Sequence, residues 1–313
     1  MEFVTISLLN GVSYGLLLFM VSAGLTLIFG MMGVLNFAHS SFYMLGAYFG
    51  YSIARFSDFW LALLLAPLAV AVLGGLIEKY MLRRVHRHGH AHELLLTFGL
   101  VFIIEELVKM FYGHYSLENP MPAALGFSAF ELFDLNYPFY RVFIALVAVV
   151  MFTAVFLLSR FTRIGLVVRA AVRRPDMVEA LGHDVPKVFL GVFAGGAALA
   201  GLAGTVAGVF YPTGPTMAHE LGVIVFVVVV VGGLGSLEGA LLASLLIGVF
   251  SSFAVGLDWS AADGLALVGL GDWALGAGGV LTTKLSTLAG AIPFAVMLLV
   301  LLLRPAGLMG EKA

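Results

Sequence analysis

The sequence predicts an all-α protein, a polytopic bundle of transmembrane helices with about eight or nine spans, some short or broken. Hydrophobic residues make up 61% of the 313 positions and charged residues only 11%, whereas a soluble domain is about 25% charged. Apolar runs of about 20 residues, the length that crosses a bilayer, recur along the chain. The 38 glycines are also typical of membrane helices.

Nine apolar segments, each bounded by charges or by Gly and Pro, are the candidate spans. They are residues 5–30, 36–54, 59–82, 94–112, 138–160, 187–210, 219–234, 237–256 and 286–303. The second and seventh are the weakest, because the glycines at 30–33 can leave 36–54 as a half-helix and 219–234 ends in a glycine-rich stretch. The first segment lacks the basic start and cleavage site of a signal peptide and is expected to be retained. We expect a single transmembrane domain over residues 1–313.

Basic residues predict the orientation of the spans. Lys and Arg concentrate in residues 79–92, in residues 160–187 and at the C-terminus, which the positive-inside rule places in the cytoplasm. Residues 113–137 contain no Lys or Arg, and residues 257–284 contain three Asp against Lys284 alone. Both segments are therefore expected outside, and nine crossings would put the N-terminus outside and the C-terminus inside.

A stripe of small residues predicts close helix packing. Gly196, Ala200, Gly204 and Gly208 recur every four residues and share one helix face. This spacing lets helix backbones approach closely in lipid. The alternative is that these glycines are scattered by composition, since glycine is common in membrane helices.

Residues 162–187 are too polar to span and predict two short helices. Pro175 breaks the helical pattern, and Gly182 ends the second helix. The apolar residues at helical spacing are Leu166, Val167, Ala170 and Ala171, followed by Met177, Ala180 and Leu181. Such an element can insert into a groove on a partner protein. Its arginines would equally suit an amphipathic helix on lipid head groups. The pattern does not distinguish docking on a protein from binding to lipid.

Four polar residues, Asn36, His39, Ser40 and Ser41, interrupt apolar sequence. Polar groups at membrane depth are costly unless protein or cavity water satisfies them. In a helix, Asn36 and Ser40 would share one face. The pattern therefore predicts the lining of a pathway or a break in a helix, with an interfacial turn as the alternative. For His39 alone we favour the interfacial turn.

Composition and missing motifs exclude several functions. The chain has no cysteine, and its net charge of −2 argues against a nucleic-acid partner. It contains no His-Glu-x-x-His, Gly-x-Ser-x-Gly or Gly-x-x-x-x-Gly-Lys-Ser/Thr motif, so another chain must bind any ATP that drives it. Alternating histidines at 86–92 give a compositional metal signal. We expect them to form a solvated loop without metal, because stable sites need further ligands in fixed geometry.

Several segments, taken in order, resemble one family. The segments that show the resemblance are LLNGVSYGLLLFMVSAGLTLIFGMMG near the N-terminus, VLNFAHSSFYMLGAY (34–48), GLVVRAAVRRPDMVEALGHDVPKV, AGGAALAGLAGTVAG, VVVVVGGLGSLEGALLASLLIG and the terminal LRPAGLMG. Together they look like the Liv-type permeases of ATP-binding-cassette (ABC) importers, which are associated with branched-chain amino acids. Two features depart from the family: Ser40 stands where glycine is usual, and residues 258–285 are longer than the usual connection. Relatives also serve urea, short amides and other amino acids.

The resemblance implies half of a translocation pathway in a bacterial inner membrane. The partners would be a second homologous permease, two cytoplasmic ATPase subunits that hold ATP and Mg, and a periplasmic binding protein. It also implies that a coupling element would sit in a groove on one ATPase. Its residues would be Arg169, Ala170, Ala171, Glu179, Ala180, Leu181 and Gly182.

Two alternative functions fit the sequence less well. A passive channel or a secondary carrier for urea or an amide has no use for the cytoplasmic element, and mid-membrane acids that ion coupling needs are scarce. A membrane-embedded enzyme would need intramembrane nucleophiles or metal ligands, and the sequence offers no such set.

Overall fold

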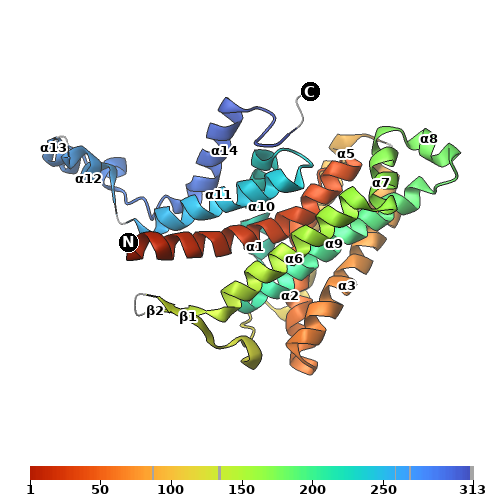
Figure 1. Cartoon of the computed structure of the whole chain (residues 1–313), viewed down its shortest axis with the longest axis horizontal. Helices are drawn as coiled ribbons and strands as arrows, with labels where there is room; N and C mark the ends of the chain where they lie inside the picture. The colour runs from red at the N-terminus through yellow and green to blue at the C-terminus, as the bar shows by residue number, and fades with distance from the viewer. Residues whose placement is uncertain (87, 133–134, 258, 268, 311–313) are drawn as a thin grey trace.

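The computed structural model describes residues 1–86, 88–132, 135–257, 259–267 and 269–310. Each predicted apolar segment contains a helix, which confirms the helical membrane bundle (Figure 1). The helices are α1 (Glu2–Met32), α2 (His39–Phe56), α3 (Phe59–Ile77), α5 (His90–Tyr112), α6 (Phe139–Phe161), α9 (Val185–Phe210), α10 (Met217–Gly232), α11 (Leu237–Gly256) and α14 (Ile292–Leu303).

Five helices within the described residues are long and apolar enough to cross a bilayer, so the protein is a multi-pass membrane protein. They are α1, the helix from Phe59 to His86, α6, α9 and α11. The prediction for 286–303 is wrong at its start, because a 3₁₀ turn, η4 (Ala289–Ala291), precedes the 12-residue α14. Near the predicted break at 30–33, α1 continues to Met32 and ends at Gly33, whose φ of 66° favours glycine.

Smaller elements connect the spans. A π-helical turn, η1 (Glu78–Leu82), and α4 (Arg83–His86) extend α3, and η2 (Ala123–Leu125) lies after α5. Strands β1 (Ser128–Leu132) and β2 (Leu135–Pro138) form an antiparallel hairpin in which Glu131 pairs with Asn136. Sequence reasoning missed this hairpin. It also missed α12 (Ala261–Ala266), α13 (Gly271–Ala277) and η3 (Gly279–Thr282), which project from the body of the bundle in Figure 1.

Glycines bring pairs of helices into backbone contact. At the crossing of α1 and α11, a methyl group on Gly15 would lie 2.7 Å from the Ser244 carbonyl oxygen. Where α2 meets α9, a methyl group on Gly204 would overlap the Tyr43 carbonyl oxygen. Gly196 faces Gly24 of α1 from further along α9.

The other two residues of the stripe also lie inside. Ala200 is fully buried, and a methyl group on Gly208 would lie 2.9 Å from Thr213 Oγ1. The stripe on α9 therefore faces α1, α2 and the chain that follows α9.

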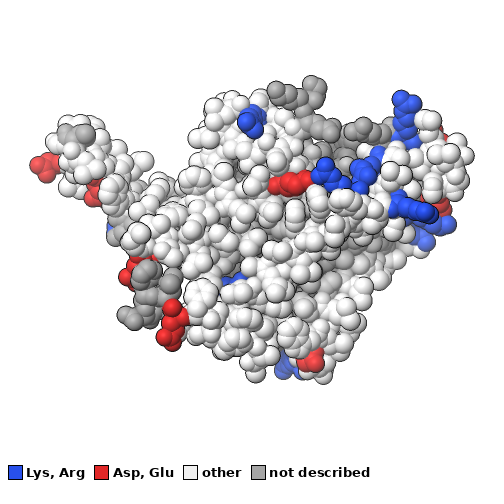
Figure 2. All heavy atoms as spheres, viewed as in Figure 1, with Lys and Arg blue, Asp and Glu red and all other residues white. Residues whose placement is uncertain are grey.

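The connecting segments gather at two ends of the bundle. At one end, here called the hairpin end, the Tyr137 hydroxyl lies 2.7 Å from Ser13 Oγ, and Leu117 bridges to Thr213. At the other, here called the basic end, Arg83 Nη2 donates to the Pro186 carbonyl oxygen at 2.9 Å. Figure 2 shows Lys and Arg concentrated over α7 and α8 at the basic end. The segments grouped by charge in the sequence therefore lie together in space.

We predict that Gly204→Ala lowers the free energy of unfolding in detergent by about 1–3 kcal/mol, because the added methyl group has no room at the α2–α9 crossing. Gly195→Ala is the matched control on the same helix, since a methyl group there meets nothing within 4 Å. Thermal unfolding followed by fluorescence measures both. Equal stability of the two variants would contradict the packing account.

Candidate functional site

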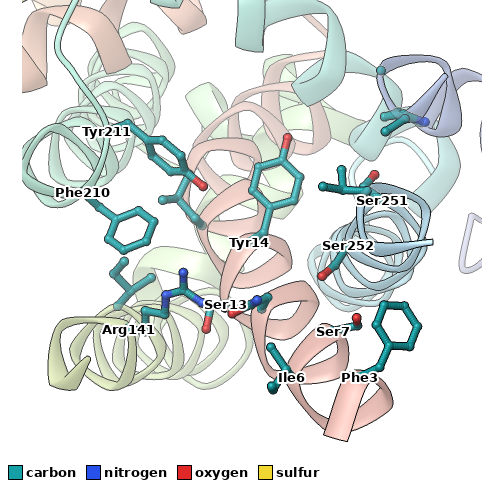
Figure 3. Close-up of a pocket in the computed structure, with 18 of the residues that line it drawn as sticks. Phe3, Ile6, Ser7, Ser13, Tyr14, Arg141, Phe210, Tyr211, Ser251 and Ser252 are labelled. Atoms are coloured by element: carbon teal, nitrogen blue, oxygen red, sulfur yellow. Dashed lines mark hydrogen bonds between the residues drawn. The ribbon is translucent and has the colours of Figure 1, made fainter. Parts of the chain in front are cut away.

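A cavity of about 890 Å³, here called the hairpin-end cavity, lies between α1, α6, α11 and the chain after α9. Figure 3 shows side chains from all of these elements around it. Its polar lining includes Ser7, Asn10, Ser13, Tyr14, Arg141, Tyr211, Ser251 and Ser252. Its apolar lining includes Phe3, Ile6, Leu17, Ile144, Phe210, Ile224 and Val255. The cavity can therefore hold a small molecule that carries both polar and apolar groups.

Arg141, in the first turn of α6, is the arginine of this cavity. Its Nη1 donates to Asn10 Oδ1 of α1, and its guanidinium carbon lies 5.5 Å from the Tyr137 ring centre and 5.2 Å from that of Phe210. Sequence reasoning missed this residue. The available signal was an arginine in the first turn of a span, next to a segment, 113–137, that has no Lys or Arg.

Asn36, His39 and Ser40 line a much smaller space. A cavity of about 20 Å³, here called the constriction, is lined by Leu25 of α1, by Asn36, Phe37, His39 and Ser40, and by Gly222, Val225 and Phe226 of α10. Asn36 lies in the loop before α2, so the expectation that a helix would carry both Asn36 and Ser40 is wrong. The loop nevertheless brings both residues to the same cavity.

The side chain of Asn36 is buried, and neither its amide nitrogen nor its amide oxygen has a hydrogen-bond partner among the described residues. An unpaired buried amide costs free energy. Ser40 Oγ donates to the Phe37 carbonyl oxygen at 3.2 Å. The constriction therefore keeps unused hydrogen-bonding capacity at Asn36.

His39 also contacts α1, and Ser41 lies outside the constriction. His39 Nε2 lies 2.9 Å from the Val21 carbonyl oxygen, so the ring attaches the start of α2 to α1. Ser41 is fully buried and is absent from the lining of the constriction.

α1 borders a succession of cavities from the hairpin end to the basic end. A cavity of about 360 Å³ shares Tyr14, Leu17 and Tyr211 with the hairpin-end cavity. Leu25 then reaches the constriction, and Gly30 reaches a cavity of about 970 Å³ at the basic end. The constriction has the smallest volume of these spaces.

The two short helices predicted in residues 162–187 are present, as α7 (Arg163–Arg173) and α8 (Pro175–Ala180). The Thr162 hydroxyl caps α7 by accepting from the Gly165 amide at 3.1 Å. Gly182 has a φ of 88°, a conformation that favours glycine and ends the second helix.

Buried side chains attach this element to the bundle. Val168 packs with Met31 of α1 and Val192 of α9. Ala171 is fully buried in a cluster with Val178 and Val185. Ala171 therefore joins α7 to α8 and α9 and does not face outward.

The remaining residues singled out in this segment are exposed. They are Arg169, Ala170, Glu179, Ala180, Leu181 and Gly182. Leu166, Met177 and Leu181 are exposed large apolar side chains on the same element. The C-terminal chain faces α7 across the basic-end cavity, which Leu166, Ala170, Ala306 and Met309 line together.

The histidine run departs in part from the expected solvated loop, because α5 begins at His90. His86 Nδ1 contacts Glu93 Oε1, and His90 Nδ1 lies 3.2 Å from Glu93 Oε2. The Glu93 side chain is buried. In the part of the chain that the structure describes, no group of three or more His, Asp or Glu side chains is arranged to hold a metal ion.

The comparisons with known proteins identify the class. The model of the family described as the permease component of the branched-chain amino acid transport system matches residues 7–301, and the chain belongs to this family. It is therefore a transport permease. No solved structure matches the chain.

Individual relatives match the sequence over most of its length. The chain is 26% identical to the high-affinity branched-chain amino acid permease protein LivH of Escherichia coli K12, over 96% of this chain and 94% of the relative. It is 27% identical to BraD of Pseudomonas aeruginosa, over 97% and 95%. A probable LivH of Methanocaldococcus jannaschii is 26% identical over 78% of each chain.

Because the chain has no cysteine, single cysteines can report which end faces outward. We predict that Ser252→Cys, in the hairpin-end cavity, reacts with a membrane-impermeant maleimide added to intact cells. His88→Cys, in the exposed loop at the basic end, should react only after permeabilisation, because basic segments face the cytoplasm. The fully buried Ser41→Cys is the unreactive control. The reverse labelling of the first two variants would overturn this orientation.

Proposed function

We propose that this chain forms half of the translocation pathway of an ATP-driven importer for amino acids, most directly branched-chain ones, in a bacterial inner membrane. The observation that carries the proposal is an exposed helical element, α7–α8, on a permease whose sequence has no nucleotide-binding motif. Such an element is suited to a groove on a partner that supplies the ATPase activity. The pathway would be completed by a second, homologous permease, and ATP and Mg would be held by two cytoplasmic ATPase subunits.

The packing of α7 supports a coupling mechanism. Val168 contacts Met31 of α1 and Val192 of α9, so movement of α7 bears on both helices. α1 lines the constriction through Leu25, and α9 crosses α1 where Gly24 faces Gly196. Closure of the ATPases would push α7–α8 and rock α1 and α9, which would open the constriction by a hinge-type change.

The substrate class rests on the relatives and on the cavity. LivH and BraD carry names of high-affinity branched-chain amino acid systems. The hairpin-end cavity combines hydroxyl groups and an arginine with apolar side chains such as Ile144 and Phe210. This lining suits a small zwitterion with an apolar side chain. A periplasmic binding protein would deliver it to the hairpin end, and the C-terminus would lie in the cytoplasm.

Purification in mild detergent through a tag on this chain tests the assembly. The proposal expects a second permease and ATPase chains to elute with it. A solitary chain that equilibrates an amino acid or urea across proteoliposomes without ATP would instead establish a passive channel.

We predict that Glu179→Arg separates ATP hydrolysis from uptake, because Glu179 is exposed on α8, in the α7–α8 element that we propose docks on the ATPase and here call the docking element. Uptake should fall at least about tenfold, as expected when a charged interfacial contact worth ~1.4 kcal/mol is lost, while basal ATPase activity remains. Gly182→Val should act in the same direction by straining a positive-φ turn. Glu118→Arg, exposed elsewhere in the chain, is the control. Normal uptake in both α8-region variants would remove the docking role.

We predict that Asn36→Leu reduces uptake about tenfold, the equivalent of one hydrogen bond of ~1.4 kcal/mol to a passing polar group. The variant should assemble normally, because leucine removes an amide that is already unpaired. Initial rates of uptake and the yield of intact complex are the two readouts. Asn136→Leu, on the exposed hairpin, is the control. Unchanged uptake would leave Asn36 without a part in the pathway.

A further inference from the structure

We propose that Arg141 binds the carboxylate group of the transported molecule in the hairpin-end cavity, so that this cavity is a carboxylate-selective entry site. The inference rests on the proposed transport function and adds to it a specific ligand group and a specific residue. It would exclude urea and simple amides as preferred substrates, because they carry no carboxylate.

One edge of the Arg141 guanidinium has no hydrogen-bond partner in the described part of the chain. Arg141 Nη1 is occupied by Asn10, but Arg141 Nε is buried and has no hydrogen-bond partner among the described residues. The structure shows no partner for Nη2 within the same ranges. Nε and Nη2 form the edge of an arginine that binds a carboxylate through two parallel hydrogen bonds. The side chain is therefore held at one nitrogen, and the edge used for carboxylate recognition has no hydrogen-bond partner within the described residues.

Aromatic neighbours fix the position of the Arg141 guanidinium. Its carbon lies 5.2 Å from the Phe210 ring centre and 5.5 Å from that of Tyr137. Tyr137 is itself held, because its hydroxyl lies 2.7 Å from Ser13 Oγ of α1. Aromatic rings attract the cation without using its hydrogen-bond donors. A preorganised donor loses little conformational entropy when it binds a ligand.

The positive charge of Arg141 lacks an acidic partner among the described residues. Within the described residues, Arg141 forms no salt bridge with Asp or Glu. Glu2, the acidic residue of the lining, lies at the start of α1 and is exposed. A charge that is partly removed from water and lacks a counter-ion favours an anionic ligand.

The rest of the cavity lining offers both polar and apolar contacts. Ser251 Oγ is buried without a partner in the described structure and lines the same cavity, so it can serve a second polar group. Ile144 and Phe210 offer apolar contact beside Arg141. Figure 3 shows Arg141 and Phe210 on one side of the space and Ser251 and Ser252 on the other. This arrangement matches a molecule with a carboxylate at one end and a short apolar chain.

The competing explanation is that Arg141 only joins α6 to α1 through Asn10. Such a role would affect stability and assembly, and it would affect ligands with and without a carboxylate equally. The test must therefore compare ligands that differ only in charged groups.

The experiment uses the purified complex of this chain with its partner subunits in nanodiscs, without the binding protein. Displacement of radiolabelled leucine is measured with two analogues: 4-methylpentanoate, which lacks the amine, and 3-methylbutylamine, which lacks the carboxylate. The wild-type complex should favour 4-methylpentanoate by roughly 10–100-fold, the range of a hydrogen-bonded charged pair. Arg141→Gln should abolish the preference, and Arg141→Lys should retain part of it, because the charge remains but the fork is lost. Arg55→Gln, an exposed arginine outside the cavity lining, should leave the preference unchanged.

Equal displacement by the two analogues in the wild type, or a preference that survives in Arg141→Gln, would overturn the inference. A wild-type complex that binds none of the probes at millimolar concentration would overturn it as well. ATP-dependent uptake of leucine by the same preparation separates these failures from a failure of the proposed function. Intact uptake without a carboxylate preference would support the importer function and contradict only the proposed role of Arg141.

Discussion

Close contact between helix backbones at glycine is the constraint on which this structure depends. Helices in lipid gain no hydrophobic free energy from associating, so van der Waals packing must hold them together. Gly15 against Ser244 joins α1 to α11, and Gly204 against Tyr43 joins α2 to α9. These contacts fix α1 in the centre of the bundle, where it borders the hairpin-end cavity, the constriction and the basic-end cavity. Larger side chains at these positions would separate the helices and change every space beside them.

The same central helix, α1, contacts both the proposed ligand-binding cavity and the proposed ATPase-docking element. At the hairpin end, Asn10 of α1 holds Arg141. At the basic end, Met31 of α1 packs with Val168 of the docking element. A rigid helix that carries both contacts can transmit a movement of α7 to the ligand cavity without a large rearrangement. The proposed switch between outward and inward states would then need flexibility at only a few hinge positions.

The sequence predicted the features that depend on neighbouring residues, namely the apolar spans and the ends of the short helices. The bilayer fixes the length of apolar runs, and Pro175 and Gly182 fix where the short helices begin and end. It missed features that arise from distant parts of the chain. Arg141 becomes informative only because Asn10, 131 positions away, occupies one of its nitrogens. Asn36 reaches the constriction through a loop, and Ala171 turns inward because Val178 and Val185 fold against it. No periodicity in the sequence encodes these contacts.

Accumulation of an amino acid against its gradient tests the central claim most directly. The complex purified through this chain would be reconstituted into proteoliposomes with the binding protein and radiolabelled leucine on the hairpin-end side and ATP with Mg on the basic-end side. The account predicts that leucine concentrates beyond equilibrium in the basic-end compartment only when ATP can be hydrolysed. Leucine that merely equilibrates, at a rate indifferent to ATP, would contradict it.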